Sequence, residues 1–232
     1  RPGFKKNDLK PWQKKQWCLA NVDGEYLARM EDILDLYEQP YDAKRPVICF
    51  DERPCQLLNH TIVPLPIKPG RVRKENYSYK REGTCCLLIA FEPLAGRRIV
   101  QVRPRRTKID YAKFMKMVVD EHYPKVDNIR LVQDNLNTHS AGSFYETFAP
   151  ETAHELKNKF EYHYTPKKAS WLNMVEIELS IIAKQCLDRR IPSMTILARE
   201  VRSFSHKRNR ARATVRWRFT TDKARTKLKS RY

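Results

Sequence analysis

The chain has 232 residues, a length that fits one domain of about 50–250 residues, at most with one appendage. Hydrophobic residues make up 41% and charged residues 31%, which leaves enough apolar material for a core and excludes a wholly disordered chain. The 46 Lys and Arg against 27 Asp and Glu give a net charge of +19, which favours a polyanionic partner, most often nucleic acid.

The first half of the chain predicts a lead-in followed by strands. Residues 1–40 are interpreted as a linker and lead-in, in which the pattern of residues 25–39 fits a helix or a strand. Short β-branched and aromatic runs bounded by turn residues are typical of strands. They predict a buried strand over residues 46–50 that stops at Asp51, and an antiparallel hairpin over residues 84–93 and 97–104. Residues 55–83 between them are expected to form a long loop or an irregular hairpin arm.

The second half predicts helices that alternate with strands. Thr107 is a candidate N-cap for a helix with one apolar face, and Ser170 is a candidate N-cap for a long helix. The expected elements are a helix over 108–121, a strand over 128–135, a helix over 143–159 interrupted near Pro150, a strand over 160–166, and helices over 170–189, from Ser193 towards 205, and after Thr221. This order predicts an α/β fold with a mixed sheet flanked by helices, as one domain over residues 41–205.

Basic charge is concentrated at the C-terminal end. Residues 199–232 hold 13 Lys and Arg against Glu200 and Asp222, a net of +11, which is more than half of the surplus. We interpret residues 206–232 as a basic arm that contacts DNA phosphates, whereas the alternative is a basic surface that only keeps the protein soluble. The candidate DNA-binding side chains of this arm are Lys207, Arg208, Arg210, Arg212, Arg216 and Arg218.

No segment predicts membrane insertion or export. The longest nearly apolar run, residues 84–91, is far shorter than the ~20 residues of a membrane span, and no charged-then-apolar leader opens the chain. The six cysteines include no C-x-x-C and no Cys/His pair at zinc spacing, which favours reduced thiols. We therefore expect a cytoplasmic location and no membrane partner.

Three acidic residues stand where strands or helices meet a sheet edge. Asp51 and Asp134 each end a predicted strand, and Glu176 lies near the start of the long helix. Groups at the carboxyl ends of adjacent strands converge on one crevice, and carboxylates gathered there need a hard cation such as Mg²⁺ or Mn²⁺. Each aspartate alone is equally compatible with an ordinary turn. Glu176 and Glu178 lie at opposite edges of the helix's apolar stripe, so periodicity does not choose between them, and one of the two is expected to be an ordinary surface glutamate.

Three short sequence motifs resemble a known family, and this resemblance favours Glu176 over Glu178. The strings CFDE (residues 49–52), VQDN (132–135) followed by His139, and HYTPKKASWLNMVEIELS (163–180) resemble the catalytic core of mariner-type DDE transposases. The resemblance is closest to the bacterial insertion-sequence branch and runs from about Trp12 to the C-terminus. The chain departs from many eukaryotic members in the 41 residues between Asp134 and Glu176, which exceed their usual mid-thirties spacing.

The resemblance implies a ribonuclease-H-like fold and a DNA transposase catalytic domain. It assigns Asp51, Asp134 and Glu176 as catalytic residues and as ligands of two Mg²⁺ or Mn²⁺ ions, for phosphodiester cleavage and strand transfer at the ends of a mobile element. Possible supporting residues are Glu52, Asn135, His139 and Asn173. The implied partners are the DNA of the element ends and of the target, and a homo-oligomer is expected during transposition. The implied location is the bacterial cytoplasm, in association with the nucleoid.

Two other functions are compatible with the same residues. One is a stand-alone ribonuclease-H-like nuclease or resolvase, which cuts DNA but does not join it. The other is a truncated transposase without catalysis that binds DNA or a full-length partner. The presence of all three acidic residues favours an active enzyme over a decayed one.

Overall fold

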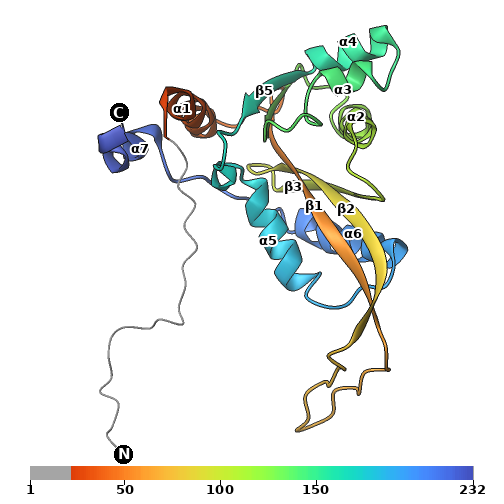
Figure 1. Ribbon diagram of the computed structural model, residues 1–232. Helices are drawn as coiled ribbons and strands as arrows, with labels where there is room; N and C mark the ends of the chain where they lie inside the picture. The colour runs from red at the N-terminus through yellow and green to blue at the C-terminus, as the bar shows by residue number, and fades with distance from the viewer. Residues whose placement is uncertain (1–21, 232) are drawn as a thin grey trace, which may run out of the picture.

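A computed structural model describes residues 22–231 of the chain and contains one five-stranded mixed sheet (Figure 1). The strand order is β3-β2-β1-β4-β5. β1 pairs with β2, and β2 with β3, in antiparallel fashion, whereas β1–β4 and β4–β5 are parallel. The predicted mixed sheet flanked by helices is confirmed. The strands are β1 (Val47–His60), β2 (Tyr79–Glu92), β3 (Arg97–Arg103), β4 (Ile129–Gln133) and β5 (Phe160–Tyr164).

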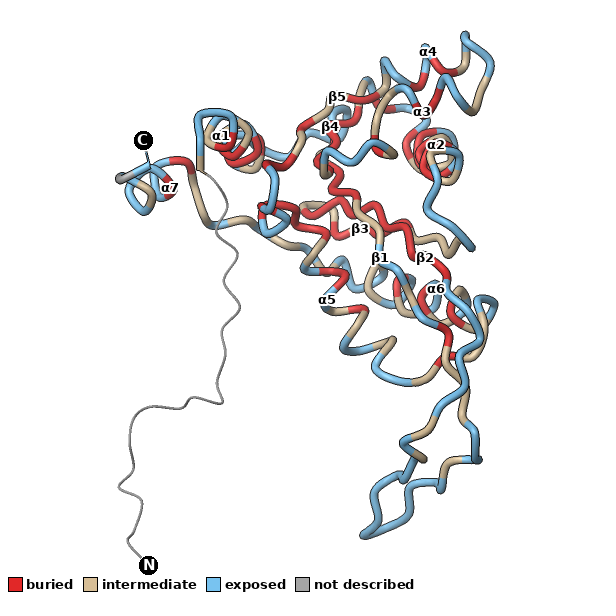
Figure 2. The backbone as a smooth tube through the Cα atoms, viewed as in Figure 1, coloured by how far each residue is buried: buried red, intermediate tan, exposed pale blue. Residues whose placement is uncertain are grey.

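The first strand is much longer than its apolar run. β1 continues past Asp51 to His60, because residues 51–60 pair with β2 across a register that ends at His60 and Tyr79. The prediction of a strand that stops at Asp51 is therefore wrong. Ladder hydrogen bonds satisfy the backbone whatever the polarity of the side chains, so a polar stretch can extend a strand that has a partner. Residues 61–78 form the irregular tip of this hairpin, which projects from the body of the protein as an exposed arm (Figures 1 and 2).

Helices cover both faces of the sheet, with one hydrophobic core under each layer. Successive residues of β1 point to opposite faces, so Cys49 joins one core while Ile48 and Phe50 join the other. The sheet is thus buried on both sides at its centre (Figure 2). One layer contains α1 (Gly24–Glu38), α5 (Val175–Gln185), α6 (Met194–Arg210) and α7 (Thr221–Lys227), and the other contains α2 (Lys108–Met117), α3 (Gly142–Tyr145) and α4 (Pro150–Asn158).

Helix boundaries differ from the predicted ones where caps and proline decide them. Thr107 caps α2 as expected, with Asp110 completing a capping box, but the helix gives way to a π-helical turn at Val118–His122. Pro150 starts α4 and so separates it from α3. Ser170 is not the cap of a long helix, because Ser170–Leu172 is a 3₁₀ turn and α5 begins only at Val175.

The N-terminal lead-in, where the structure describes it, is part of the folded body. Asp23 caps α1, which resolves the ambiguous stretch as a helix, and Met30, Ile33 and Leu34 are fully buried in the core shared with α5 and α6. The first 21 residues of the predicted lead-in, with Trp12, lie outside the described residues. The expected boundary at residue 40 therefore does not coincide with a break in packing.

The C-terminal segment is docked along its length. α6 is one continuous helix, so the expected boundary at residue 205 falls inside it. After α6, the backbone of Arg212 passes over Gly96 so closely that a Cβ on that glycine would lie 2.8 Å from the Arg212 carbonyl carbon. α7 then contacts α1, with the hydroxyl of Thr221 donating to Asp35 at 2.6 Å and Arg225 pairing with Glu31 at 2.8 Å. The segment follows the body of the protein rather than extending from it as a separate arm.

No helix within residues 22–231 is long and apolar enough to cross a membrane.

Candidate active site

The parallel pairing of β1 and β4 brings the two aspartates to the same region. Cys49 is paired with Val132, and Asp51 and Asp134 each lie two residues beyond that pair. Asp134 is the first residue after β4, whereas Asp51 lies within β1, opposite Ile89 of β2. The sequence therefore places both carboxylates correctly for convergence, although only one of them ends a strand.

Asn173 ties the start of α5 to the strand that carries Asp51. Its buried side-chain amide donates to the carbonyl oxygen of Phe50 at 2.8 Å, and its Oδ1 accepts from the backbone N–H of Val175 at 3.4 Å. Glu176 lies in the first turn of α5, directly after this connection. A buried Asn that links a strand carbonyl to a helix start fixes where the first turn of that helix lies.

Burial raises the pKa of the Asp51 carboxyl to about 7, and the charges of Glu176 and Asp134 contribute to this rise. The backbone N–H of Glu52, which donates to Asp51 Oδ1 at 2.7 Å, and His139 oppose it. Asp51 is therefore near enough to both Glu176 and Asp134 for their charges to repel its own. Such mutual repulsion is the electrostatic condition under which a bound cation stabilises a site.

His139 connects Asp134 to Glu52 inside the protein. The side chain is fully buried, with Nδ1 on Asp134 Oδ1 and Nε2 at 3.1 Å from Glu52 Oε2. Burial lowers the pKa of His139, but the hydrogen bonds and charges of Asp134 and Glu52 outweigh burial and raise it to about 9. At neutral pH both ring nitrogens carry protons, so each donates to one carboxylate. Glu52 also meets Arg106 at 3.4 Å.

Tyr111 and Gln133, which the sequence analysis did not identify as site residues, hold His139 in place through hydrogen bonds. The hydroxyl of Tyr111 donates to Gln133 Oε1 at 2.9 Å, and Gln133 Nε2 donates to the carbonyl oxygen of His139 at 2.8 Å. The ring of His139 also lies edge-on to Phe50, with centroids 5.1 Å apart. The sequence feature that could have identified Gln133 is its place at the end of an apolar strand, next to Asp134. A polar residue at such a position is expected to be buried and hydrogen-bonded, and Gln133 is fully buried.

The other candidate supporting residue, Asn135, is exposed on the loop after Asp134. The structure thus brings Asp51, Asp134, Glu176, Glu52, His139 and Asn173 into one region and leaves Asn135 at its surface.

Glu178 is not a surface residue, contrary to expectation. Its carboxylate is fully buried and accepts from Arg98 of β3 at 2.6 Å and from Arg208 of α6 at 2.8 Å. Burial opposes its ionisation, but the two guanidinium groups overcome that effect and lower its pKa. The two glutamates of α5 therefore have different partners. Glu178 is held by two arginines, whereas Glu176 interacts electrostatically with Asp51.

Arg208 must accordingly be removed from the residues expected to contact DNA. Its guanidinium is mostly buried against Glu178, because α6 turns that side chain towards the sheet. The other expected contacts are exposed: Lys207, Arg210, Arg212, Arg216 and Arg218.

The donors near Asp51 suit a hard divalent cation. They are carboxylate oxygens, which Mg²⁺ and Mn²⁺ prefer, and the repulsion among Asp51, Asp134 and Glu176 is the kind that a cation relieves. Within residues 22–231 no three His, Cys, Asp or Glu side chains are close enough to share one ion. Asp51 is nonetheless within electrostatic range of both Asp134 and Glu176.

Comparison with known proteins places this geometry in context. The family model described as DDE superfamily endonuclease matches residues 46–197, which include Asp51, Asp134 and Glu176. No curated protein has a matching sequence.

Several solved structures of the Mos1 mariner transposase share the fold. The strand transfer complex has a TM-score of 0.62 at 13% identity, with 94% of this chain and 65% of that chain covered. The paired end complex with Mn has a TM-score of 0.59 at 12% identity and covers 94% and 66%, and the one with Mg has 0.56 at 13% identity with the same coverage. The chain thus spans slightly less than two thirds of the length of these Mos1 chains.

Proposed function

Because the chain belongs to the DDE superfamily of endonucleases, we propose that it is the catalytic domain of a mariner-like DNA transposase. Its reaction is metal-dependent cleavage of phosphodiester bonds at the ends of a mobile element, followed by transfer of the freed strand to target DNA. The observation that supports this function most directly is geometric: parallel pairing aligns Asp51 of β1 with Asp134 after β4, and Asn173 bonds the start of α5, which carries Glu176, to β1.

In this proposal Asp51, Asp134 and Glu176 hold two Mg²⁺ or Mn²⁺ ions. When bound, such ions stabilise the attacking and leaving oxygens of an in-line displacement. The protein's part is to position the ligands. His139 fixes the orientation of Asp134 through Nδ1 and is itself held by Glu52, while Asn173 fixes α5 relative to β1. Supporting groups of this type orient a carboxylate before the ion arrives.

The partners and location follow from the same proposal. The Mos1 structures are described as paired-end and strand transfer complexes, which supports DNA ends and target DNA as partners and a homo-oligomer as the working state. We place the protein in the bacterial cytoplasm, in association with the nucleoid. This placement extends the similarity of its motifs to the bacterial insertion-sequence branch.

A plasmid nicking assay combined with strand joining tests the function. The full chain is incubated with supercoiled plasmid in Mn²⁺, and separately with an oligonucleotide that carries a free 3′-hydroxyl. Nicking together with covalent joining is expected for a transposase. Nicking without joining would indicate a nuclease or resolvase, and DNA binding with neither activity would indicate a non-catalytic relative.

Divalent metal is expected to stabilise the folded chain. An ion that binds only the native site at tenfold its Kd adds about 1.4 kcal/mol by mass action, or roughly 3–6 °C in Tm for a chain of this size. Melting curves in Mg²⁺ or Mn²⁺ and in EDTA measure the effect. Asp51→Asn should shrink the metal-dependent rise, since it removes one ligand charge. An equal rise in both proteins would show that the ion binds elsewhere.

His139→Asn is expected to weaken metal binding by about 10–100-fold, the usual cost of losing a group that orients a ligating carboxylate. The readout is the metal concentration that gives half of the rise in Tm, so it does not depend on activity. His154 of α4 is exposed and provides a matched control, because His154→Asn removes a histidine far from Asp134. If both variants require the same metal concentration as the wild type, His139 does not position Asp134.

A further inference from the structure

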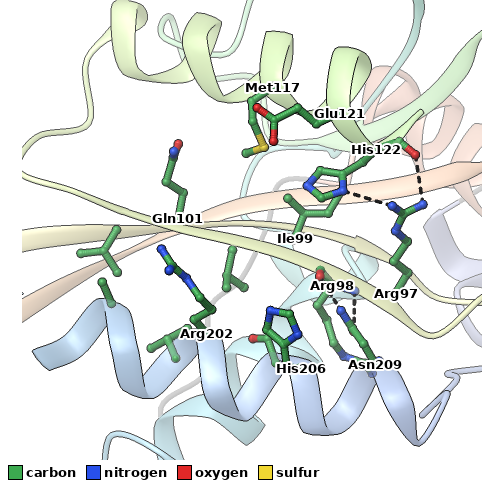
Figure 3. A pocket seen from close by; sticks show the side chains of 15 residues that line it. Arg97, Arg98, Ile99, Gln101, Met117, Glu121, His122, Arg202, His206 and Asn209 are labelled. Carbon is green, nitrogen blue, oxygen red and sulfur yellow. Dashed lines mark hydrogen bonds between the residues drawn. The ribbon is translucent and has the colours of Figure 1, made fainter. Parts of the chain in front are cut away.

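A basic groove runs along the outer edge of the sheet, outside the carboxylate region. β3 is one of the two edge strands of the described sheet, and its one partner within residues 22–231 is β2. Two adjoining cavities of about 560 and 730 Å³ lie beside it, and both are lined by Val102 of β3 and by Arg202 and His206 of α6. Figure 3 shows the first of them, with α6 on one side of β3, and Met117, Glu121 and His122 on the other. None of the three proposed metal ligands lines either cavity.

One face of α6 presents a regular row of basic side chains to this groove. Arg199, Arg202, His206 and Arg210 are spaced three, four and four residues apart, which places them along one side of a helix. All four are exposed and line the larger cavity, while Leu197 and Val201 are buried beneath them. In Figure 3 Arg202 projects from α6 towards β3. We call these four residues the α6 row.

The α6 row carries charge that the described part of the protein does not neutralise. Among residues 22–231, Arg202, His206 and Arg210 have no ion pair or side-chain hydrogen bond, and Arg199, 73% exposed, meets only its neighbour Glu200 at 3.3 Å. This contrasts with Arg208 on the same helix, which is committed to Glu178. Guanidinium groups that no carboxylate engages are available for phosphates, with which they form charge-assisted and often bidentate hydrogen bonds.

We propose that the α6 row and the groove beside β3 bind the phosphate backbone of DNA. The proposal rests on the proposed function for its substrate class, and it assigns a surface that is distinct from the carboxylates and from the segment after α6. From Arg199 to Arg210 the helix rises about 16 Å, which corresponds to roughly five phosphates along one strand of a duplex. Contacts to phosphates carry no base information, so binding through phosphate contacts of the α6 row is independent of base sequence.

The test is the salt dependence of binding to a duplex of arbitrary sequence, measured in EDTA so that no cleavage intervenes. The triple variant Arg199→Gln/Arg202→Gln/Arg210→Gln removes three charges from the α6 row. The control Lys113→Gln/Lys125→Gln/Lys157→Gln removes three exposed charges elsewhere. Each lost phosphate contact lowers the slope of log K against log salt by about 0.9, so the row variant should lose roughly 2–3 in slope and the control should keep the wild-type value.

Equal slopes for the row variant and the control would overturn the proposal. If the row variant does not fold, Ser203→Glu is the deciding variant, because it adds a negative charge at an exposed position lining the same cavity and replaces Ser with a better helix former. Weaker binding by Ser203→Glu supports the groove, and unchanged binding refutes it. Cleavage at saturating DNA and low salt is measured in parallel. Its absence in the wild type would refute the proposed function without bearing on the slopes.

Discussion

Replacing Asp51 with Asn is expected to abolish metal-dependent DNA cleavage while leaving DNA binding intact. Asp51 is partly buried and interacts electrostatically with both Glu176 and Asp134. Metal ions contribute several kcal/mol to the stabilisation of transition-state charge, which corresponds to roughly a thousandfold or more in rate. Asp134→Asn and Glu176→Gln should fail in the same way. Plasmid nicking in Mn²⁺ and a binding titration in EDTA measure the two properties separately.

The stability of the Asp51 variant provides the control against simple unfolding. The pKa of Asp51 is raised to about 7 in the folded protein, above the ordinary value near 4. Between these values the folded state binds the additional proton, so ionisation of Asp51 lowers the stability of the wild type as pH rises from about 4 to 7. In EDTA, Asp51→Asn should therefore be at least as stable as the wild type at pH 8, and its advantage should disappear near pH 4. A variant that is inactive and also melts earlier at pH 8 would contradict this account.

Replacing Glu178 with Gln is expected to destabilise the fold by about 3–5 kcal/mol, the usual cost of breaking a buried ion pair. The loss leaves the Arg98 guanidinium, which is 0% exposed, without its counter-charge. The same carboxylate links β3 and α5 to Arg208 of α6, so three elements lose their common contact. Unfolding by urea measures the effect. The exposed pair of Glu146 with Lys108 is the matched control, and Glu146→Gln should cost less than about 1 kcal/mol.

Acid should reduce the difference between the Glu178 variant and the wild type. The folded-state pKa of Glu178 is lowered by Arg98 and Arg208, so its contribution to stability is complete above the unfolded pKa near 4.3. The contribution is lost as pH falls through the lower, folded value. The variant has no carboxylate at this position, so its stability does not fall for this reason as the pH decreases. Two results would show that the buried contact of Glu178 with Arg98 and Arg208 does not stabilise the fold. One is that Glu178→Gln loses no more unfolding free energy than Glu146→Gln at pH 7, and the other is that the difference in stability between Glu178→Gln and the wild type does not narrow in acid.

The sequence alone was sufficient for the class of fold and for the residues near the site. Apolar runs located all five strands, the cap at Thr107 and the expected helix start at Ser193 located two helices, and the motifs around Asp51, Asp134 and Glu176 indicated the family. These features are local, because strand propensity, capping and short motifs are written in neighbouring residues. The length of β1, in contrast, could not be predicted from neighbouring residues. Its polar half depends on β2, whose paired residues are up to 38 positions away in the sequence, as in the pair of Asp51 with Ile89.

Only the tertiary structure showed how the environments of the two glutamates of α5 differ. Glu176 and Glu178 have the same chemistry and lie two residues apart, at opposite edges of one apolar stripe. Their environments differ because Arg98 and Arg208, 80 and 30 residues away, meet Glu178 in the interior. The same contact withdrew Arg208 from the surface and left the α6 row exposed. Charge and spacing are therefore properties of the sequence, whereas burial and pairing arise only when distant elements pack, and they decide which charges are structural and which remain free for DNA.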